Sequence, residues 1–176
     1  MLNDKSTDLS TNRTSIDAGW VDPGTLRKGR GGRPLCRWCG IEIPSRRRTF
    51  CSTYCVHEHR LRSDPAYLRQ QVFKRDSGIC AACGCDAEKM RRVLWLALRH
   101  IGRRRLAPHW KQILDSLGVP TEFVFSRRSL WEADHILPVI EGGGQCDLSN
   151  LRTLCVGCHK LATSELRRRR TNRRLE

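Results

Sequence analysis

The chain has 176 residues, 39% of them hydrophobic, which leaves room for one compact domain or two small ones. A mean hydropathy of −0.53 argues against a large apolar core, and the absence of a long apolar run excludes a membrane-spanning segment. The 33 Lys and Arg residues against 18 Asp and Glu give a net charge of +15, which favours a polyanion such as nucleic acid over a membrane surface as the partner.

Residues 1–33 are polar and of mixed charge, and they end in a basic run from Arg27 to Arg33. We interpret them as a flexible basic arm, which is solvated or lies along nucleic-acid phosphates. They contain no apolar stretch of the secretory kind. We therefore expect an intracellular, reducing location: the cytoplasm, or the nucleoid or nucleus.

Cysteines are the most informative residue type in this chain. There are ten, and in a reducing compartment grouped cysteines more often bind metal than form a disulfide framework. Four thiolates with no vacant position are typical of structural zinc, so residues 34–63 are expected to form an N-terminal zinc finger with four cysteine ligands. These ligands would be Cys36, Cys39, Cys51 and Cys55. His57 and His59 follow and could replace a thiolate, but we expect them on a helix, facing solvent or phosphate.

A helix is predicted from Pro65 to Asp76, because Asp64 suits its N-cap and Pro65 its first turn. After Cys80-x-x-Cys83-x-Cys85, residues 88–119 have a helical pattern interrupted at Pro108, inside an insertion that spans 88–128. The apolar residues of the first helical part are expected to pack in the core; they are Val93, Leu94, Leu96, Ala97 and Ile101.

Two strands and a final helix are predicted next. The strands cover 129–135 and 151–154, with a Gly-rich loop at 141–144, and the helix runs from about 157 into Arg167–Arg170, leaving a basic tail at 171–176. Adjacent strand residues point to opposite sides. We therefore expect Asp134 and His135 to have different roles, one binding metal and the other facing the reacting phosphate, unless the strand ends there.

These residues together carry a family resemblance. Asp134-His135, Asn150 and His159, framed by Cys80-x-x-Cys83 and Cys155-x-x-Cys158, resemble the HNH endonuclease family. Roughly residues 34–170 are also similar to the HNH module fused to SNF2-type annealing helicases. That similarity rests on Leu35-Cys36, Phe50-Cys51-Ser52, Tyr67-Leu68-Arg69, Val72-Phe73 and Gly142-Gly143-Gly144-Gln145-Cys146.

The resemblance implies a fold and a mechanism. The fold is α+β: a small zinc-stabilised ββα-metal, treble-clef-like nuclease core in an endonuclease domain at 64–170. The activity is metal-dependent hydrolysis of DNA phosphodiester bonds with one catalytic metal. His135 would be the general base, Asp134 and His159 would hold Mg²⁺ or another divalent ion, and Asn150 would fix the loop and orient His135.

The resemblance also implies a second structural zinc. Its ligands would be Cys80, Cys83, Cys155 and Cys158, with Cys85 as an alternative to Cys83, while Cys146 is expected to be a small buried thiol. DNA is expected to bind through its phosphates to the Arg- and Lys-rich surface. Two alternatives stay open: a zinc-stabilised nucleic-acid-binding module without turnover, and an RNA-directed or structure-selective nuclease.

Overall fold

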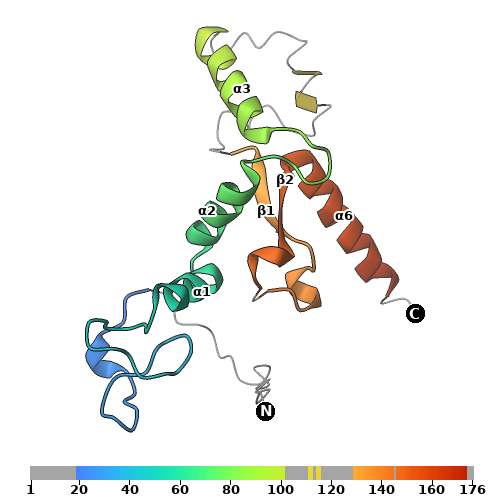
Figure 1. Ribbon diagram of the computed structural model, residues 1–176. Coiled ribbons are helices and arrows are strands. Elements are labelled where there is room, and N and C mark those ends of the chain that lie inside the picture. The colour runs from blue at the N-terminus through green and yellow to red at the C-terminus, as the bar shows by residue number, and fades with distance from the viewer. Residues whose placement is uncertain (1–18, 102–110, 113, 116–128, 145, 174–176) are drawn as a thin grey trace, which may run out of the picture. The chain divides into compact units, whose positions relative to one another are not determined.

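The computed structural model describes residues 19–101, 111–112, 114–115, 129–144 and 146–173 (Figure 1). The chain divides into two compact units, Met1–Pro65 and Ala66–Glu176. Within the described ranges, no helix combines the length and the apolar character needed to cross a membrane.

The first unit is a small fold built around a cluster of four cysteines, two of which are buried in its core. It begins with η1 (Pro23–Thr25) and ends with α1 (Thr53–Ser63). The hydroxyl of Ser52 caps α1 by accepting a hydrogen bond from the Cys55 amide at 3.1 Å, which fixes Cys55 in the first turn. The core of the unit consists of Cys36, Ile43 and Cys55, against which Leu26, Trp38, Phe50 and Cys51 pack.

Two expectations for this unit are wrong. Residues 23–33 are not a free arm, because Leu26 packs in the core and Lys28 pairs with Pro34 in a β-bridge; residues 1–18 lie outside the described part. His59 does not face solvent. It is 5% exposed, its ring meets Phe50 edge-on at 5.0 Å, and its Nδ1 lies 3.1 Å from the Ser63 hydroxyl.

The second unit contains the two predicted strands and the final helix. Strands β1 (Trp131–His135) and β2 (Leu151–Cys155) pair antiparallel, and α6 (Val156–Asn172) follows β2 directly and packs against both strands (Figure 1). The Cys155 Sγ serves as the N-cap of α6, accepting from the Cys158 amide at 3.5 Å. The predicted α+β class and its ββα core are thus confirmed.

Helix α2 (Pro65–Asp76) is fastened to the strands by two arginines. Arg69 lies over the Trp131 ring at 3.7 Å and donates to the Trp131 carbonyl at 2.6 Å. Arg75 donates to the carbonyls of Leu148 and Leu151 at 2.6 and 2.7 Å. Such charge-assisted bonds are stronger than neutral ones, so they hold the helix beside the edge of the sheet.

The core of this unit joins helices and strands. Its buried members are Val72, Ala87, Leu94, Leu114, Leu130, Trp131, Leu151 and Val156, and Cys146 packs against them as a partly buried thiol. In α3 (Ala87–Ile101) the buried residues Ala87 and Leu94 are seven positions apart, so they lie on the same face of the helix. Val93 and Leu96, which were expected in the core, are 48% and 50% exposed because they lie on other faces of this helix. Most of the predicted second helical part, after Pro108, lies outside the described residues.

Candidate active site and metal centres

A cavity of about 240 Å³ opens between the β1–β2 pair and α6, along that helix from His159 to Arg169. Three of the four residues predicted for the catalytic site line it, namely Asp134, His135 and His159, whereas Asn150 is not among the lining residues. The other lining residues are Ile136, Pro138, Val139, Arg152, Ala162, Thr163, Leu166 and Arg169. The cavity therefore combines a carboxylate, two imidazoles and two guanidinium groups.

Asp134 and His135 border the same cavity although they are adjacent in the chain. Strand β1 ends at His135, and the next amide, that of Ile136, donates to the Asn150 carbonyl at 2.8 Å, just before β2 begins. The alternation of side chains in a strand no longer applies where the strand ends. Because β1 ends at His135, both side chains can face the cavity, as the sequence predicts for a strand that ends at this position.

Asp134 has two partners in the cavity. The Arg152 Nε and Nη2 atoms each lie 3.0 Å from Asp134 Oδ2. The His159 Nε2 lies 3.7 Å from the other oxygen, Oδ1. The carboxylate is 17% exposed, so it is shielded yet reachable from the cavity.

Asn150 holds the loop between the strands in place. Its Oδ1 accepts from the Leu137 amide at 2.7 Å, and its Nδ2 donates to the carbonyls of Leu137 and Gly143 at 3.1 Å each. These bonds close the loop that contains η2 (Val139–Glu141) and η3 (Leu148–Asn150). The Asn150 side chain thus bonds to the backbone of Leu137, two residues after His135, and to that of Gly143.

Gly143 is required by this loop. A Cβ at Gly143 would collide with the Leu137 carbonyl and would lie 2.8 Å from Asn150 Nδ2. We expect Gly143→Ala to lower the free energy of unfolding by about 1–3 kcal/mol, which thermal unfolding followed by circular dichroism will detect. Gly144→Ala is the control, since its Cβ would meet only the Val139 side chain, at 3.1 Å. Equal melting temperatures for the two variants would contradict this account.

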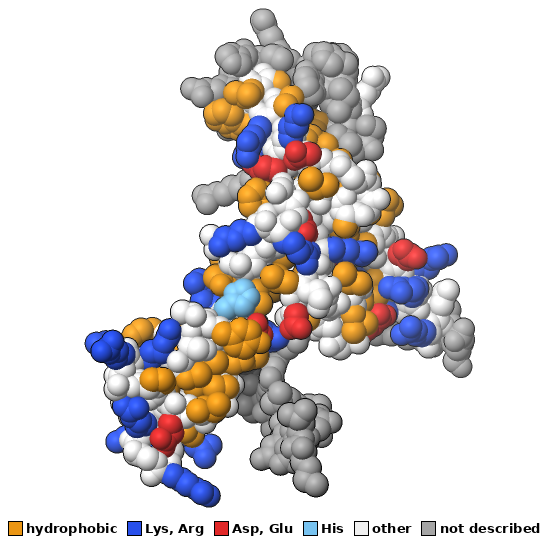
Figure 2. Space-filling model, viewed as in Figure 1, with side chains coloured by type: hydrophobic (Ala, Val, Ile, Leu, Met, Phe, Trp, Pro, Cys, Tyr) orange, Lys and Arg blue, Asp and Glu red, His pale blue; other side chains and the backbone are white. Residues whose placement is uncertain are grey.

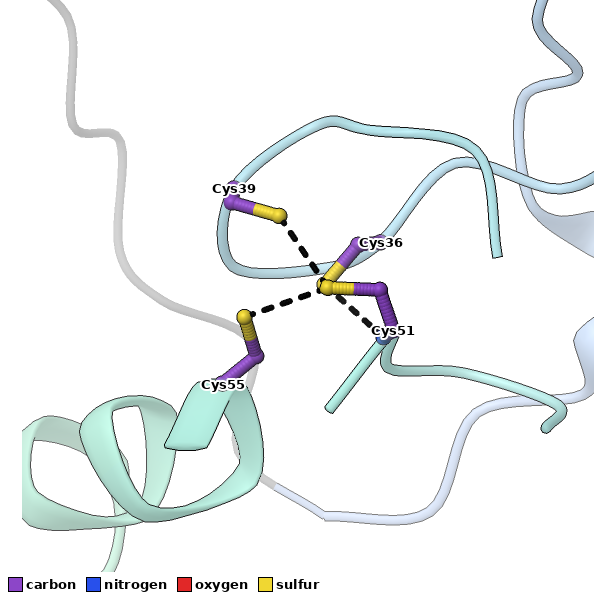
Figure 3. Close-up of side chains that lie close together, drawn as sticks. All are labelled: Cys36, Cys39, Cys51 and Cys55. Carbon is purple, nitrogen blue, oxygen red and sulfur yellow. Dashed lines mark hydrogen bonds between the residues drawn. The ribbon is translucent and has the colours of Figure 1, made fainter. Parts of the chain in front are cut away.

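The first cysteine cluster has the geometry of a zinc site (Figure 3). The Cys51 sulfur lies 3.4 Å from that of Cys39 and 3.3 Å from that of Cys55, and the Cys51 amide points at the Cys36 sulfur at 3.4 Å. All four sulfurs lie within 4.8 Å of one another. Thiolates around tetrahedral zinc are about 3.8 Å apart, given zinc–sulfur bonds of about 2.3 Å, so this cluster could hold the ion.

A second cluster brings five cysteines together. The sulfurs of Cys80, Cys83, Cys85 and Cys155 lie within 4.8 Å of one another, with 3.8 Å between Cys83 and Cys155. Cys158, the remaining ligand expected from the sequence, is not one of these four, but burial and the neighbouring thiols of Cys155, Cys83 and Cys80 raise the pKa of its thiol. The cluster could hold one zinc, with either Cys85 or Cys158 as the fourth ligand.

One thiol in each cluster has a pKa below its usual value. Burial raises the pKa of Cys80, but backbone amides from Cys155 and the Cys80–Cys83 turn outweigh it and bring that pKa to about 6. At Cys36 burial is likewise outweighed by backbone amides, and the pKa falls to about 7. Each cluster thus contains a thiol that readily becomes a thiolate at neutral pH, which is the form that binds zinc.

Single replacements test which cysteine completes the second cluster. We expect Cys85→Ser and Cys158→Ser each to retain about two zinc ions per chain, because the other thiol can complete the tetrahedron. The double variant should retain about one. Elemental analysis of the purified proteins gives the count. Loss of one zinc from either single variant would assign the fourth position to that residue alone.

Several residues around the cavity were missed in the sequence. Arg152 lines it, and Arg69 and Arg75 of α2 donate to backbone carbonyls in and beside the strands. Arg169 also lines the cavity, and it belongs to the Arg167–Arg170 run that the sequence placed at the end of the final helix. Arg152 could have been found from the strand register. If β2 begins at Leu151, directly after Asn150, and Leu151 pairs with His135, then Arg152 lies opposite Asp134. Arg69 belongs to one of the motifs that carry the resemblance, but its bonds to Ser129 and Trp131, about 60 residues away, could not be predicted from it. Arg75 gave no signal, because it donates to backbone carbonyls more than 70 residues away.

Comparison with known proteins gives a consistent set of matches. The HNH endonuclease family model matches residues 122–165. The mouse protein named DNA annealing helicase and endonuclease ZRANB3 is 37% identical over 155 residues, and its human counterpart is 34% identical over the same length. The matches cover 80% of this chain but only 14% of those relatives. The crystal structure of the human ZRANB3 HNH domain is 34% identical, with 65% of this chain and 98% of that chain covered and a TM-score of 0.45.

Proposed function

The chain belongs to the HNH endonuclease family, and from this premise we propose that it is a metal-dependent DNA endonuclease with its active site in the cavity beside β1, β2 and α6. The observation that carries the proposal is the convergence of Asp134, His135 and His159 on one cavity. All three lie inside the segment matched by the family model. The chain covers only 14% of the length of the ZRANB3 relatives, so the proposal concerns the endonuclease activity alone.

Asp134 and His159 would hold the catalytic divalent ion. Their donor atoms, Oδ1 and Nε2, lie 3.7 Å apart. A carboxylate and an imidazole this close together could hold one divalent ion such as Mg²⁺ or Mn²⁺. When bound, the ion would offset negative charge on the phosphorane and on the leaving 3′ oxygen.

His135 would act as the general base. Its imidazole borders the cavity and is half-buried, so it can meet a water molecule there. Histidine is the side chain best suited to accept a proton at neutral pH, and proton transfer of this kind contributes about 10²–10⁴ to a rate. Asn150 would position His135 indirectly, through the loop that it closes.

The substrate would approach as a polyanion. The chain carries a net charge of +15, and Figure 2 shows many Lys and Arg side chains on the surface. Helix α6, which contains His159, continues into Arg167–Arg170, and Arg169 reaches the cavity. These cations would hold the phosphates of DNA on either side of the scissile bond. The two cysteine clusters would each bind structural zinc.

A plasmid assay tests the function. We expect the zinc-loaded protein to convert supercoiled DNA to the relaxed form in Mg²⁺ or Mn²⁺ but not in EDTA, since one active site cuts one strand at a time. Intact DNA binding without cutting in either metal would instead support the binding-module alternative. Cutting of labelled duplex RNA in preference to DNA of the same length would contradict the assignment of substrate.

A further inference from the structure

The carboxylate that we propose as a metal ligand is already bonded to a cation. Asp134 and Arg152 lie directly opposite each other in the β1–β2 register. Two nitrogens of the Arg152 guanidinium meet Asp134 Oδ2 at 3.0 Å, while the His159 Nε2 approaches Oδ1. The pair faces the cavity, where the Arg152 side chain is 35% exposed and that of Asp134 is 17% exposed.

A guanidinium and a divalent cation compete for this carboxylate. Both are positive, and at a distance of a few ångströms in a partly shielded site they repel each other. A metal ion bound to Asp134 therefore favours movement of the Arg152 head group away from Oδ2. Its exposure lets the side chain change rotamer without disturbing the buried core residues of β2, Leu151 and Leu154.

A DNA phosphate is the natural alternative partner for the released guanidinium. Arg152 lines the same cavity as His135, where the proposed function places the scissile phosphate. The planar fork of an arginine binds phosphate oxygens as readily as a carboxylate. In the free protein, however, Asp134 occupies that fork.

We propose that Arg152 couples metal binding to DNA binding. In the free protein it neutralises Asp134 and keeps the affinity for the divalent ion low. When DNA enters, its phosphate draws the guanidinium away and leaves Asp134 to the ion. The proposal rests on the proposed function, in which Asp134 is a metal ligand. Because coupling of this kind is reciprocal, the ion should strengthen DNA binding by the same factor as DNA strengthens ion binding.

Calorimetric titration of Mn²⁺ tests the coupling. Zinc-loaded protein in a His135→Ala background, which prevents cutting, is titrated alone and with a short DNA duplex. We expect DNA to tighten Mn²⁺ binding about tenfold in this parent and by less than about twofold after Arg152→Gln. Without DNA, the Arg152→Gln variant should bind Mn²⁺ about tenfold more tightly than the parent.

Two controls make the outcome decisive. Lys74→Gln removes the same charge from an exposed position of α2 that does not line the cavity, and it should leave the Mn²⁺ affinity and the coupling unchanged. Zinc content and circular dichroism confirm that each variant is folded. Unchanged or weaker Mn²⁺ binding by folded Arg152→Gln would overturn the proposal and leave a purely structural cross-strand pair. Unchanged Mn²⁺ binding by Asp134→Asn would instead overturn the metal-ligand role in the proposed function.

Discussion

His135→Ala is expected to reduce plasmid nicking by about 10²–10⁴-fold while leaving DNA affinity within about twofold of the parent. The imidazole borders the cavity at the end of β1, and no side-chain hydrogen bond to it is present in the described part of the structure. Its removal should therefore cost the proton acceptor without loosening the strand. The loop after β1 stays closed, since Asn150 bonds to Leu137 and Gly143 rather than to the imidazole.

Three measurements separate catalysis from structure in this experiment. Initial nicking rates in Mn²⁺ report on catalysis, fluorescence anisotropy of a labelled duplex in EDTA reports on binding, and thermal unfolding reports on the fold. His57→Ala is the matched control, because it removes a half-buried histidine that lies in the first unit. Retained nicking by folded His135→Ala would refute the role of base. Parallel loss of binding and stability would make His135 a structural residue.

The parts of the fold that the sequence predicted are those set by local chemistry. Pro65 indicated where α2 begins, whereas Asp64, predicted as the N-cap of this helix, ends α1 and binds Arg60 at 2.8 Å. The strand before Asp134-His135 is present with its start two residues later than expected, at Trp131. The cysteine pairs indicated two clusters because the spacing of zinc ligands is short and local. Within each motif the deciding residues lie within a few positions of one another, although the second cluster then joins Cys83 to Cys155, which is 72 residues away.

The parts that could not be predicted depend on contacts between distant segments. The burial of His59 requires the ring of Phe50 from the preceding loop, and a helical pattern alone does not show that partner. The sulfur of Cys85 also lies in the second cluster. The turn from Cys80 to Cys85 lies against β2, where the Ala81 amide donates to the Thr153 carbonyl at 2.8 Å. Spacing favoured Cys83 over Cys85, whereas in the structure both of these sulfurs lie close to those of Cys80 and Cys155.

The largest loss of stability is expected from Cys80→Ser. Cys80 is 1% exposed, and the backbone amides around it lower the pKa of its thiol to about 6. Serine cannot supply the thiolate, so the second zinc should be lost. Structural zinc contributes roughly 10 kcal/mol or more of folding free energy, which is comparable to the whole stability of a small domain at about 5–15 kcal/mol. We expect the unit Ala66–Glu176 to lose cooperative unfolding.

The same replacement should remove the cavity, because the cluster fixes both of its walls. Cys155 ends β2 and caps α6, and His159 follows Cys158 in the first turn of that helix. Elemental analysis should find one zinc per chain, and near-ultraviolet circular dichroism should show the loss of packing around Trp131. Cys146→Ser is the control, because this thiol lies outside both clusters and should leave two zinc ions and the unfolding transition in place. Two zinc ions and a cooperative transition in Cys80→Ser would show that the ββα core is held by its apolar contacts and by Arg69 and Arg75 rather than by metal.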